Sequence, residues 1–355
     1  MRRLHSVLSL STALLAGWAS ATAAESRLVS ITRFDTFERR PGARPEEQIL
    51  LSPPLSPGFP WRELVVSWNA ATNLALTVEV RPLPPEDSRF YSFGRWTAVP
   101  GPESPRASEA NQKDDRGILR TDTLTLHTPA DRAQVRITLS GPDTALKRLS
   151  LAFSGTQPFT ATPEATPSPA PRDLDVPLRS QAEFPEGIDK WCSPTCTSML
   201  LAYWSAQRNR SDWNPSVPET AAAVYDPVYR GTGNWSFNMA FAGSHAGLQA
   251  AVARFPGLRE LETWVASGAP AAASVSNSLL KGKPEPTPGD GHLVVVRGFT
   301  AEGDVIINDP GVRIDRVRRV VPRATFLKAW GHSDQTVYLV WPDDHPLPSG
   351  PAFPQ

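Results

Sequence analysis

The sequence predicts a two-domain protein, in which an antiparallel β-sandwich precedes an α+β domain. Three observations lead to this fold class. Short segments of alternating apolar and polar side chains, separated by Gly and Pro, fill residues 24–155 and are typical of antiparallel strands. Residues 156–176 are rich in Pro, Thr, Ala and Ser and are expected to form an extended linker. Residues 177–345 combine helical periodicity with buried strands, which favours an α+β domain, and residues 346–355 are expected to be a tail.

The first 23 residues have the features of a secretory signal peptide. Arg2 and Arg3 form a short basic start, residues 7–18 are mostly apolar, and residues 21–23 offer a small-residue cleavage site. The apolar run is too short for a spanning helix, although an uncleaved anchor is the alternative. No later segment of the sequence is long and apolar enough to cross a bilayer. We therefore expect an exported protein, secreted or periplasmic, with no transmembrane segment after the signal.

The composition of the chain limits the kinds of partner that we expect it to bind. The chain has 355 residues, enough for two hydrophobic cores, and its 36 basic and 36 acidic residues cancel. This balance argues against nucleic acid or an anionic membrane as a partner. The sequence contains no Cys or His cluster with metal-ligand spacing, and we expect no cofactor.

The first domain offers strands but no evident catalytic constellation. Its clearest strand patterns are at residues 62–68, 74–80, 121–126, 134–139 and 149–153. His127 is a lone histidine at a strand end and is interpreted as structural or solvated. By fold analogy alone, a ligand such as a polysaccharide or another cell-surface polymer is a hypothesis for this domain.

The second domain is expected to begin with a helix and to continue mainly with antiparallel strands. Further helices are predicted from apolar spacing at 218–225, 248–255, 258–265 and 324–330. Strands are predicted at 271–275, 292–297, 305–308, 317–321 and 336–341. Residues 231–241 are interpreted as a loop rich in glycine and aromatic residues.

Cys192 is the candidate nucleophile. Ser193 suits the N-cap of a helix and Pro194 its first position, while apolar residues from Met199 to Trp204 recur at helical spacing. Cys192 is therefore expected just before the helix N-terminus. The partial positive charge there favours a thiolate and lowers the thiol pKa.

Cys196 is interpreted as a buried, inert thiol beside the apolar face of the same helix. A disulfide between Cys192 and Cys196 is the alternative, and exported proteins often contain one. Residues four apart on a regular helix have Cβ atoms too far apart for such a bridge. A zinc site would need more ligands than two thiols.

His292 and Asp309 are the candidate base and orienting acid. His292 begins one predicted strand and Asp309 follows the next. In a hairpin centred near residues 301–302, His292 lies opposite residue 311, with Asp309 a two-residue diagonal away on the same face. Asn308 then points to the opposite face, and a register slip of one residue would exchange the two side chains.

Gln181 lies 11 residues before Cys192. A side-chain amide in such a position can help the Cys192 backbone N–H to stabilise the oxyanion of a tetrahedral intermediate. Each signal alone is weak. Cysteine before a helix, then Gly-His and an apolar strand, then Asn-Asp-Pro, in that order, is more specific for a thiol-dependent hydrolase.

These motifs resemble the peptidase C39-like family, which is related to bacteriocin-processing cysteine peptidases of the papain-like superfamily. The resemblance covers about residues 177–342. Residues 191–195 resemble the nucleophile motif of the family, and Gly291-His292 resembles its histidine motif. Asn308-Asp309-Pro310 resembles the acid motif, and Gln181 falls where the family has its oxyanion glutamine. Further likeness is found at 233–236 and 326–330. The resemblance implies a papain-like fold and a cysteine peptidase acting on a peptide or protein substrate through Cys192, His292, Asp309 and Gln181.

The sequence departs from the exporter-linked members of that family. It has Ser193 where they have glycine after the nucleophile, and it contains no G-x-x-x-x-G-K-[ST] loop. We therefore do not expect this protein to process double-glycine leader peptides, as the exporter-linked members do.

Several functional alternatives stay open on the sequence. They are acyl transfer by the same thioester chemistry, and a non-catalytic cell-surface or polysaccharide-binding protein that uses the papain-like domain as a scaffold. A metal hydrolase would need a motif such as H-E-x-x-H, which is missing from the sequence. His245, the rival to His292, is expected to start a helix. Since every candidate follows the linker, the first domain is predicted to be dispensable for chemistry.

Overall fold

The structure is a computed structural model that describes residues 25–101, 105–157 and 171–355. The expected signal peptide at 1–23 and most of the expected linker, at 158–170, lie outside the described residues.

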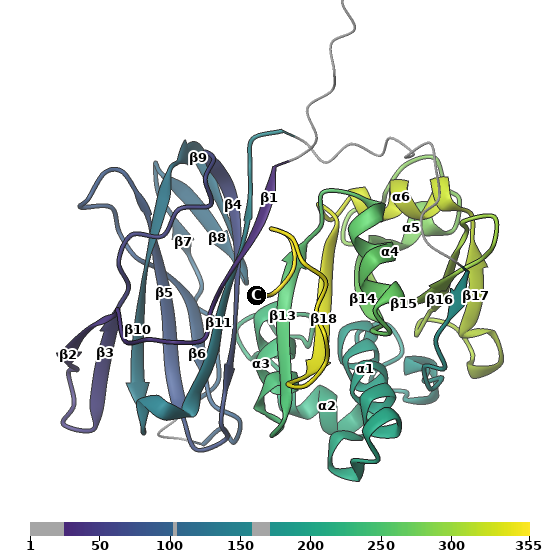
Figure 1. The fold of residues 1–355 in the computed structure, drawn as a ribbon, viewed down its shortest axis with the longest axis horizontal. Helices are drawn as coiled ribbons and strands as arrows, with labels where there is room; N and C mark the ends of the chain where they lie inside the picture. Colours follow the sequence, from purple (N-terminus) through teal and green to yellow (C-terminus); the bar gives the residue numbers. More distant parts are fainter. Residues whose placement is uncertain (1–24, 102–104, 158–170) are drawn as a thin grey trace, which may run out of the picture.

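The first domain consists of two antiparallel sheets that enclose one hydrophobic core (Figure 1). The six-stranded sheet has the order β1 (Ser26–Ile31), β11 (Leu146–Ser154), β4 (Trp61–Ala70), β9 (Thr123–Ala130), β8 (Gly117–Arg120), β7 (Gln112–Lys113). The five-stranded sheet has the order β2 (Glu38–Pro41), β3 (Glu47–Leu51), β10 (Arg132–Ser140), β5 (Ala75–Leu83), β6 (Tyr91–Trp96). A short 3-10 helix, η1 (Asp143–Ala145), precedes β11.

The period-two pattern of the sequence explains the core. In β5, Leu76, Val78 and Val80 are buried while the residues between them are partly exposed, so one face of the strand packs inward. The five strands expected from the sequence are β4, β5, β9, β10 and β11, which confirms those predictions. Thr121 belongs instead to a tight turn between β8 and β9, where its φ is 55°.

The second domain has one antiparallel sheet with helices around it (Figure 1). The sheet has the order β13 (Leu248–Arg254), β18 (Thr336–Pro342), β14 (Ala271–Ser276), β15 (Gly291–Phe299), β16 (Val305–Asn308), β17 (Arg318–Val321), and β12 (Arg172–Asp173) also pairs with β15. The helices are α1 (Cys192–Arg208), α2 (Val217–Val224), α3 (Trp235–Ser244), α4 (Leu258–Ala266), α5 (Asn277–Leu280) and α6 (Arg323–Gly331). The short 3-10 helices are η2 (Gln181–Glu183), η3 (Ser211–Trp213) and η4 (Ile314–Arg316).

Three expectations for this domain were wrong. Residues 248–255, predicted as a helix, contain strand β13, which is buried on both faces. In a continuous apolar run of that kind, the spacing of apolar residues does not distinguish a strand from a helix. Residues 231–241, predicted as a loop, contain most of α3, whose N-cap Asn234 accepts a hydrogen bond from Phe237 N. His245 ends α3 and does not start a helix.

The second domain also begins earlier than expected. Asp173 forms ion pairs with Arg297 at 2.6 Å and Arg318 at 2.8 Å, and Leu174 and Val176 are buried in the core. Residues 172–176 thus belong to the sheet domain although the sequence places them in the linker.

The two domains share packing and hydrogen bonds. Asn69 of β4 bonds both backbone groups of Ala250, with Nδ2 donating to the carbonyl and Oδ1 accepting from the N–H, each at 2.9 Å. Strand β13 is an edge strand of its own sheet, so Asn69 satisfies groups that the sheet leaves unpaired. Gly243 of α3 permits the close approach, because a Cβ there would lie 2.1 Å from Asn69 Nδ2.

The last residues of the chain lie between the domains (Figure 1). Ala352 and Phe353 are buried, and the Leu28 N–H of β1 donates to the Pro351 carbonyl at 2.9 Å. Residues 346–355, expected as a tail, therefore contribute to the junction between the two domains.

Candidate active site

Cys192 is the first residue of α1, so the helix begins two residues earlier than the sequence predicts. The N-cap is Trp191, and Ser193 does not cap the helix because its buried hydroxyl pairs with the hydroxyl of Tyr338 at 2.8 Å. The Cys192 thiol still lies in the first turn, where the N–H groups lack intrahelical acceptors. The helix N-terminus therefore stabilises negative charge on the sulfur, as expected.

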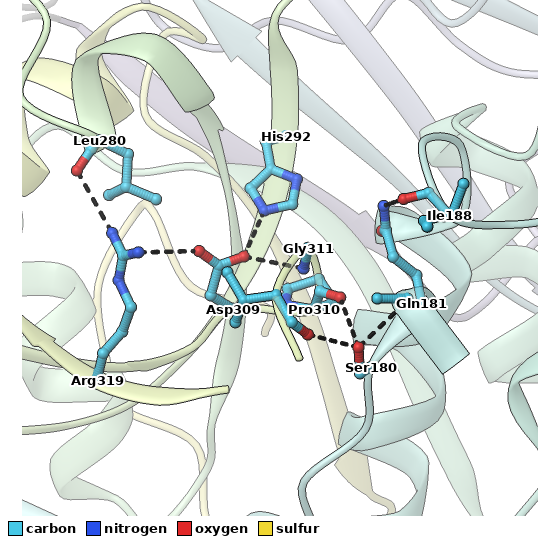
Figure 2. Close-up of polar contacts among 11 residues, drawn as sticks. Ser180, Gln181, Ile188, Leu280, His292, Asp309, Pro310, Gly311 and Arg319 are labelled. Atoms are coloured by element: carbon cyan, nitrogen blue, oxygen red, sulfur yellow. Dashed lines mark hydrogen bonds and ion pairs between the residues drawn. The ribbon is translucent and has the colours of Figure 1, made fainter. Parts of the chain in front are cut away.

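His292 and Asp309 form the central contact of the site. His292 Nε2 lies 2.7 Å from Asp309 Oδ1, and both side chains are buried (Figure 2). Because Nε2 is hydrogen-bonded to Asp309, Nδ1 is the ring nitrogen of His292 that can exchange a proton with a nucleophile. The sequence predicted this pair and their order on adjacent strands.

The hairpin register is the one assumed from the sequence. Val295 pairs with Asn308 and Val296 with Ile307, which extrapolates to His292 opposite residue 311. A Cβ added to Gly311 would lie 3.0 Å from His292 Cε1, so the two residues are in contact. A slip of one residue, which would have presented Asn308, does not occur.

Asp309 is held by two further groups (Figure 2). The Gly311 N–H donates to Oδ1 at 3.0 Å, and Arg319 Nη1 lies 3.3 Å from Oδ2. Burial alone would raise the pKa of Asp309, but its hydrogen bond to His292, the charge of His292, the Gly311 N–H and Arg319 outweigh burial and lower the pKa. Asp309 is therefore an anion that fixes the His292 ring.

The thiol and the imidazole shift each other's pKa in opposite directions. Burial opposes both charged forms, yet contact with His292 lowers the pKa of Cys192, helped by the backbone N–H groups of Leu293 and Ser193. Burial likewise opposes the imidazolium, but Asp309 and Cys192 raise the pKa of His292 to about 9. A thiolate–imidazolium pair is thus favoured near neutral pH.

Cys196 has the opposite environment. It is fully buried, and burial raises the pKa of its thiol well above the ordinary value. Both cysteines are free, so the disulfide alternative is not realised in the structure.

Gln181 lies in η2 and borders a cavity of about 210 Å³ together with Cys192, His292 and Asp309. Its backbone N–H donates to the Pro310 carbonyl at 3.0 Å, next to Asp309 (Figure 2). Its Nε2 donates to the Ile188 carbonyl, and Oε1 has no hydrogen-bond partner among the described residues. The structure therefore brings all four predicted site residues to one place.

His245 lies elsewhere. Its Nδ1 contacts the carbonyls of Phe241 and Ala242 at 3.1 and 3.2 Å, and burial lowers its pKa. It borders neither cavity that contains Cys192. His245 therefore lies outside the site that contains Cys192.

A larger cavity, of about 660 Å³, also borders the thiol and contains residues that the sequence did not suggest. Cys192 and His292 border it, and so do residues 120–123 of the first domain. The sequence indicates a strand near residues 121–126, but no local signal places that segment beside a cysteine some 70 positions away.

Among the described residues, no group of three or more His, Cys, Asp or Glu side chains is placed to hold a metal ion. Within the same part of the chain, no helix is long and apolar enough to span a membrane.

The second domain thus combines an antiparallel sheet with a cysteine at a helix N-terminus and a buried His–Asp pair. Residues 173–338 match the model of the peptidase C39-like family, and residues 9–154 match the model of the peptidase C39 N-terminal domain. The second domain is therefore similar to the peptidase C39-like family, and the first domain is similar to the N-terminal domain of C39 peptidases.

Comparison with solved structures finds a crystal structure from Bacillus anthracis described as that of a C39-like peptidase. It is 18% identical, with a TM-score of 0.35, and the match covers 49% of this chain and 98% of the other. No curated protein matches the chain.

Proposed function

We propose that the protein is an exported cysteine peptidase that hydrolyses peptide bonds. The observation that carries this proposal is the 2.7 Å contact between His292 Nε2 and Asp309 Oδ1 at a cavity shared with the Cys192 thiol. Similarity to the peptidase C39-like family supports the same activity. Export rests on the signal-like features of residues 1–23.

In the proposed reaction, the Cys192 thiolate attacks the carbonyl carbon and a C–S bond forms. The carbonyl oxygen takes the electron pair and is stabilised by the Cys192 N–H and by Gln181 Nε2, of which one N–H is not used by Ile188. The C–N bond then breaks as the His292 imidazolium protonates the leaving amine. Water, deprotonated by His292, hydrolyses the thioester and restores the thiolate.

Asp309 keeps the His292 ring in the orientation and tautomer that this cycle needs. It does so as an anion throughout, since its carboxylate is held by Gly311 and Arg319 as well. Arg319 is therefore a positioning residue that acts through Asp309.

We also propose the finer architecture implied by the resemblance. The two sheets of residues 25–157 would form a β-sandwich, and residues 171–345 would have the papain-like arrangement of helix and sheet. The described strand orders and the helix that carries Cys192 support both assignments.

The test combines thiol labelling with cleavage of a peptide library. A peptide-like electrophile should modify Cys192, identified by mass spectrometry, and the wild-type protein should cleave peptides that the Cys192→Ala variant leaves intact. The Cys196→Ala variant is the matched control and should keep both properties. Labelling without any cleavage, accompanied by new acyl–amine products, would identify an acyl transferase; absence of both labelling and cleavage would contradict a catalytic role.

A further inference from the structure

The turn between β8 and β9 brings the first domain to the reacting thiol. Residues 120–123 border the 660 Å³ cavity together with Cys192 and His292. Thr121, at the tip, has a left-handed φ of 55°, a conformation that costs free energy for a β-branched residue. Such a conformation persists only where its surroundings fix it.

The turn is fixed to the second domain through Asp122. Its Oδ2 accepts the N–H of Trp235, the first residue of α3, at 2.5 Å, and its Oδ1 accepts the hydroxyl of Thr123. On the same side of the interface, Arg106 donates to the Ala222 and Tyr225 carbonyls. Residues 120–123 therefore form a fixed wall of the cavity.

The charge of this cavity is unbalanced. Three exposed cations border it, Arg120 from the first domain and Lys190 and Arg230 from the second. Among the described residues, none of these three side chains has a hydrogen bond or ion pair. Of the two acids in the same cavity, Asp122 is bound to Trp235, and Asp189 alone is unpaired in the described part of the chain.

The 210 Å³ cavity that also borders the thiol differs. It is lined by Asp290 and Asp309, both with lowered pKa values, and by Asp189, which it shares with the larger cavity, while Lys281 is the exposed cation among its lining residues. A peptide bound at the Cys192 thiol would thus meet excess positive charge in the larger cavity and not in the smaller one. Unpaired charges of one sign in a cleft raise the local concentration of ligands of opposite charge.

We infer that this protein, if it acts as the peptidase proposed above, selects peptides with Asp or Glu side chains on one side of the scissile bond, and that Arg120 of the first domain is a specificity-determining residue. The first domain is then part of the substrate site.

The test uses the full chain and a proteome-derived peptide library, with cleavage sites read by mass spectrometry. We expect Asp and Glu to be enriched on one side of the sites cut by the wild type. Arg120→Ala should lower kcat/KM for an acidic peptide about fivefold, and Arg120→Glu should remove the enrichment. Arg95→Glu is the matched control, because Arg95 is exposed on the same domain and borders neither cavity that contains Cys192. Equal melting temperatures of the variants would show that the fold is intact.

The outcomes separate this inference from the proposed function. If the wild type cleaves peptides without any enrichment of Asp or Glu, the inference is overturned and the proposed peptidase activity stands. If the wild type cleaves nothing, binding of fluorescent peptides to the Cys192→Ala variant decides. If Glu-containing peptides bind more tightly than matched Lys-containing peptides, and salt weakens this binding, the preference for acidic peptides is supported although peptidase activity is not. Equal binding of the two kinds of peptide overturns the inferred preference.

Discussion

The carboxylate of Asp122 in the first domain accepts the backbone N–H of Trp235, the first residue of α3 in the second domain, at 2.5 Å. A helix N-terminus favours an anion at that position. Burial nevertheless dominates, and it raises the pKa of Asp122 to about 6 although the Trp235 N–H, Thr123 and the charge of Arg254 oppose it. The junction between the domains therefore contains an acid that is costly to ionise.

The stability of the protein should accordingly fall as pH rises through this range. The folded protein binds the Asp122 proton more tightly than the unfolded chain does, so the free energy of unfolding decreases between the ordinary pKa near 4 and about 6. Over that interval the loss is at most about 3 kcal/mol. Asp122→Asn keeps the acceptor and cannot ionise, and it should be more stable than the wild type at pH 7.5 but not at pH 4.

Chemical denaturation at several pH values checks this prediction. Asp115→Asn is the control, because Asp115 is exposed on the same domain and has no hydrogen-bond partner among the described residues. An Asp122→Asn protein with the wild-type pH dependence would show that another group titrates at the junction.

A fragment that begins at residue 171 should be markedly less stable than the full chain. Leu28, Val65 and Ala152 of the first domain pack into the core of the second, and Phe237 and Ala240 of α3 pack into the core of the first. Removal of the first domain exposes these apolar surfaces to water. The full chain should unfold in one thermal transition, and a fragment that melts within a few degrees of it would contradict this expectation.

The sequence predicts that the first domain is dispensable for chemistry, and it gives no sign that the two domains depend on each other for stability. Local patterns report periodicity, and they were sufficient for the strands of the first domain and for Cys192, His292 and Asp309. The bond between Asn69 and Ala250 joins residues 181 positions apart, and no local pattern encodes it. Similarly, β13 is buried on both faces because the first domain covers one of them. Its sequence therefore lacks the alternation of apolar and polar residues that identifies a strand with one exposed face.

The site was largely predictable because its geometry follows from a single hairpin. Once β15 and β16 pair as adjacent strands, the register places Asp309 beside His292. The support from Arg319 was not predictable, since it comes from β17 and depends on a further strand pairing. The same holds for Arg120, which borders the same cavity as the thiol only through the packing of two domains.

Arg319→Met should lower activity by weakening the anion that orients His292. Arg319 is one of the groups that lower the pKa of Asp309, so its removal weakens the anion beside His292. We expect kcat/KM to fall roughly fivefold, the size of an ion pair worth about 1 kcal/mol, and the pH profile to shift, with partial recovery in Arg319→Lys. Arg316→Met, at an exposed residue nearby, is the control and should resemble the wild type. Equal effects of both methionine variants would remove the positioning role.

The two thiols should differ in reactivity. His292 lowers the pKa of Cys192, whereas burial raises that of Cys196, so iodoacetamide should label Cys192 with an apparent pKa below the free value of about 8.5 and leave Cys196 unmodified. Peptide mapping of the labelled native protein over a pH series measures both rates. Similar rates at the two positions, or an oxidised Cys192–Cys196 pair, would contradict the assignment of Cys192 as nucleophile.

The last prediction separates the roles of His292 and Asp309. The active form pairs a Cys192 thiolate with a His292 imidazolium, so activity should rise with pH through the lowered thiol pKa and fall as pH passes about 9, where His292 loses its proton. His292→Ala should reduce turnover by several orders of magnitude, since the thiolate then lacks both its partner and a proton donor for the leaving amine. Asp309→Asn keeps a side chain that can contact the ring but removes the charge that raises the His292 pKa. It should therefore retain measurable activity, with its alkaline limb moved to lower pH. His245→Ala, distant from the thiol, is the control; if it abolished turnover while a folded His292→Ala protein remained active, the assignment of the base would be wrong.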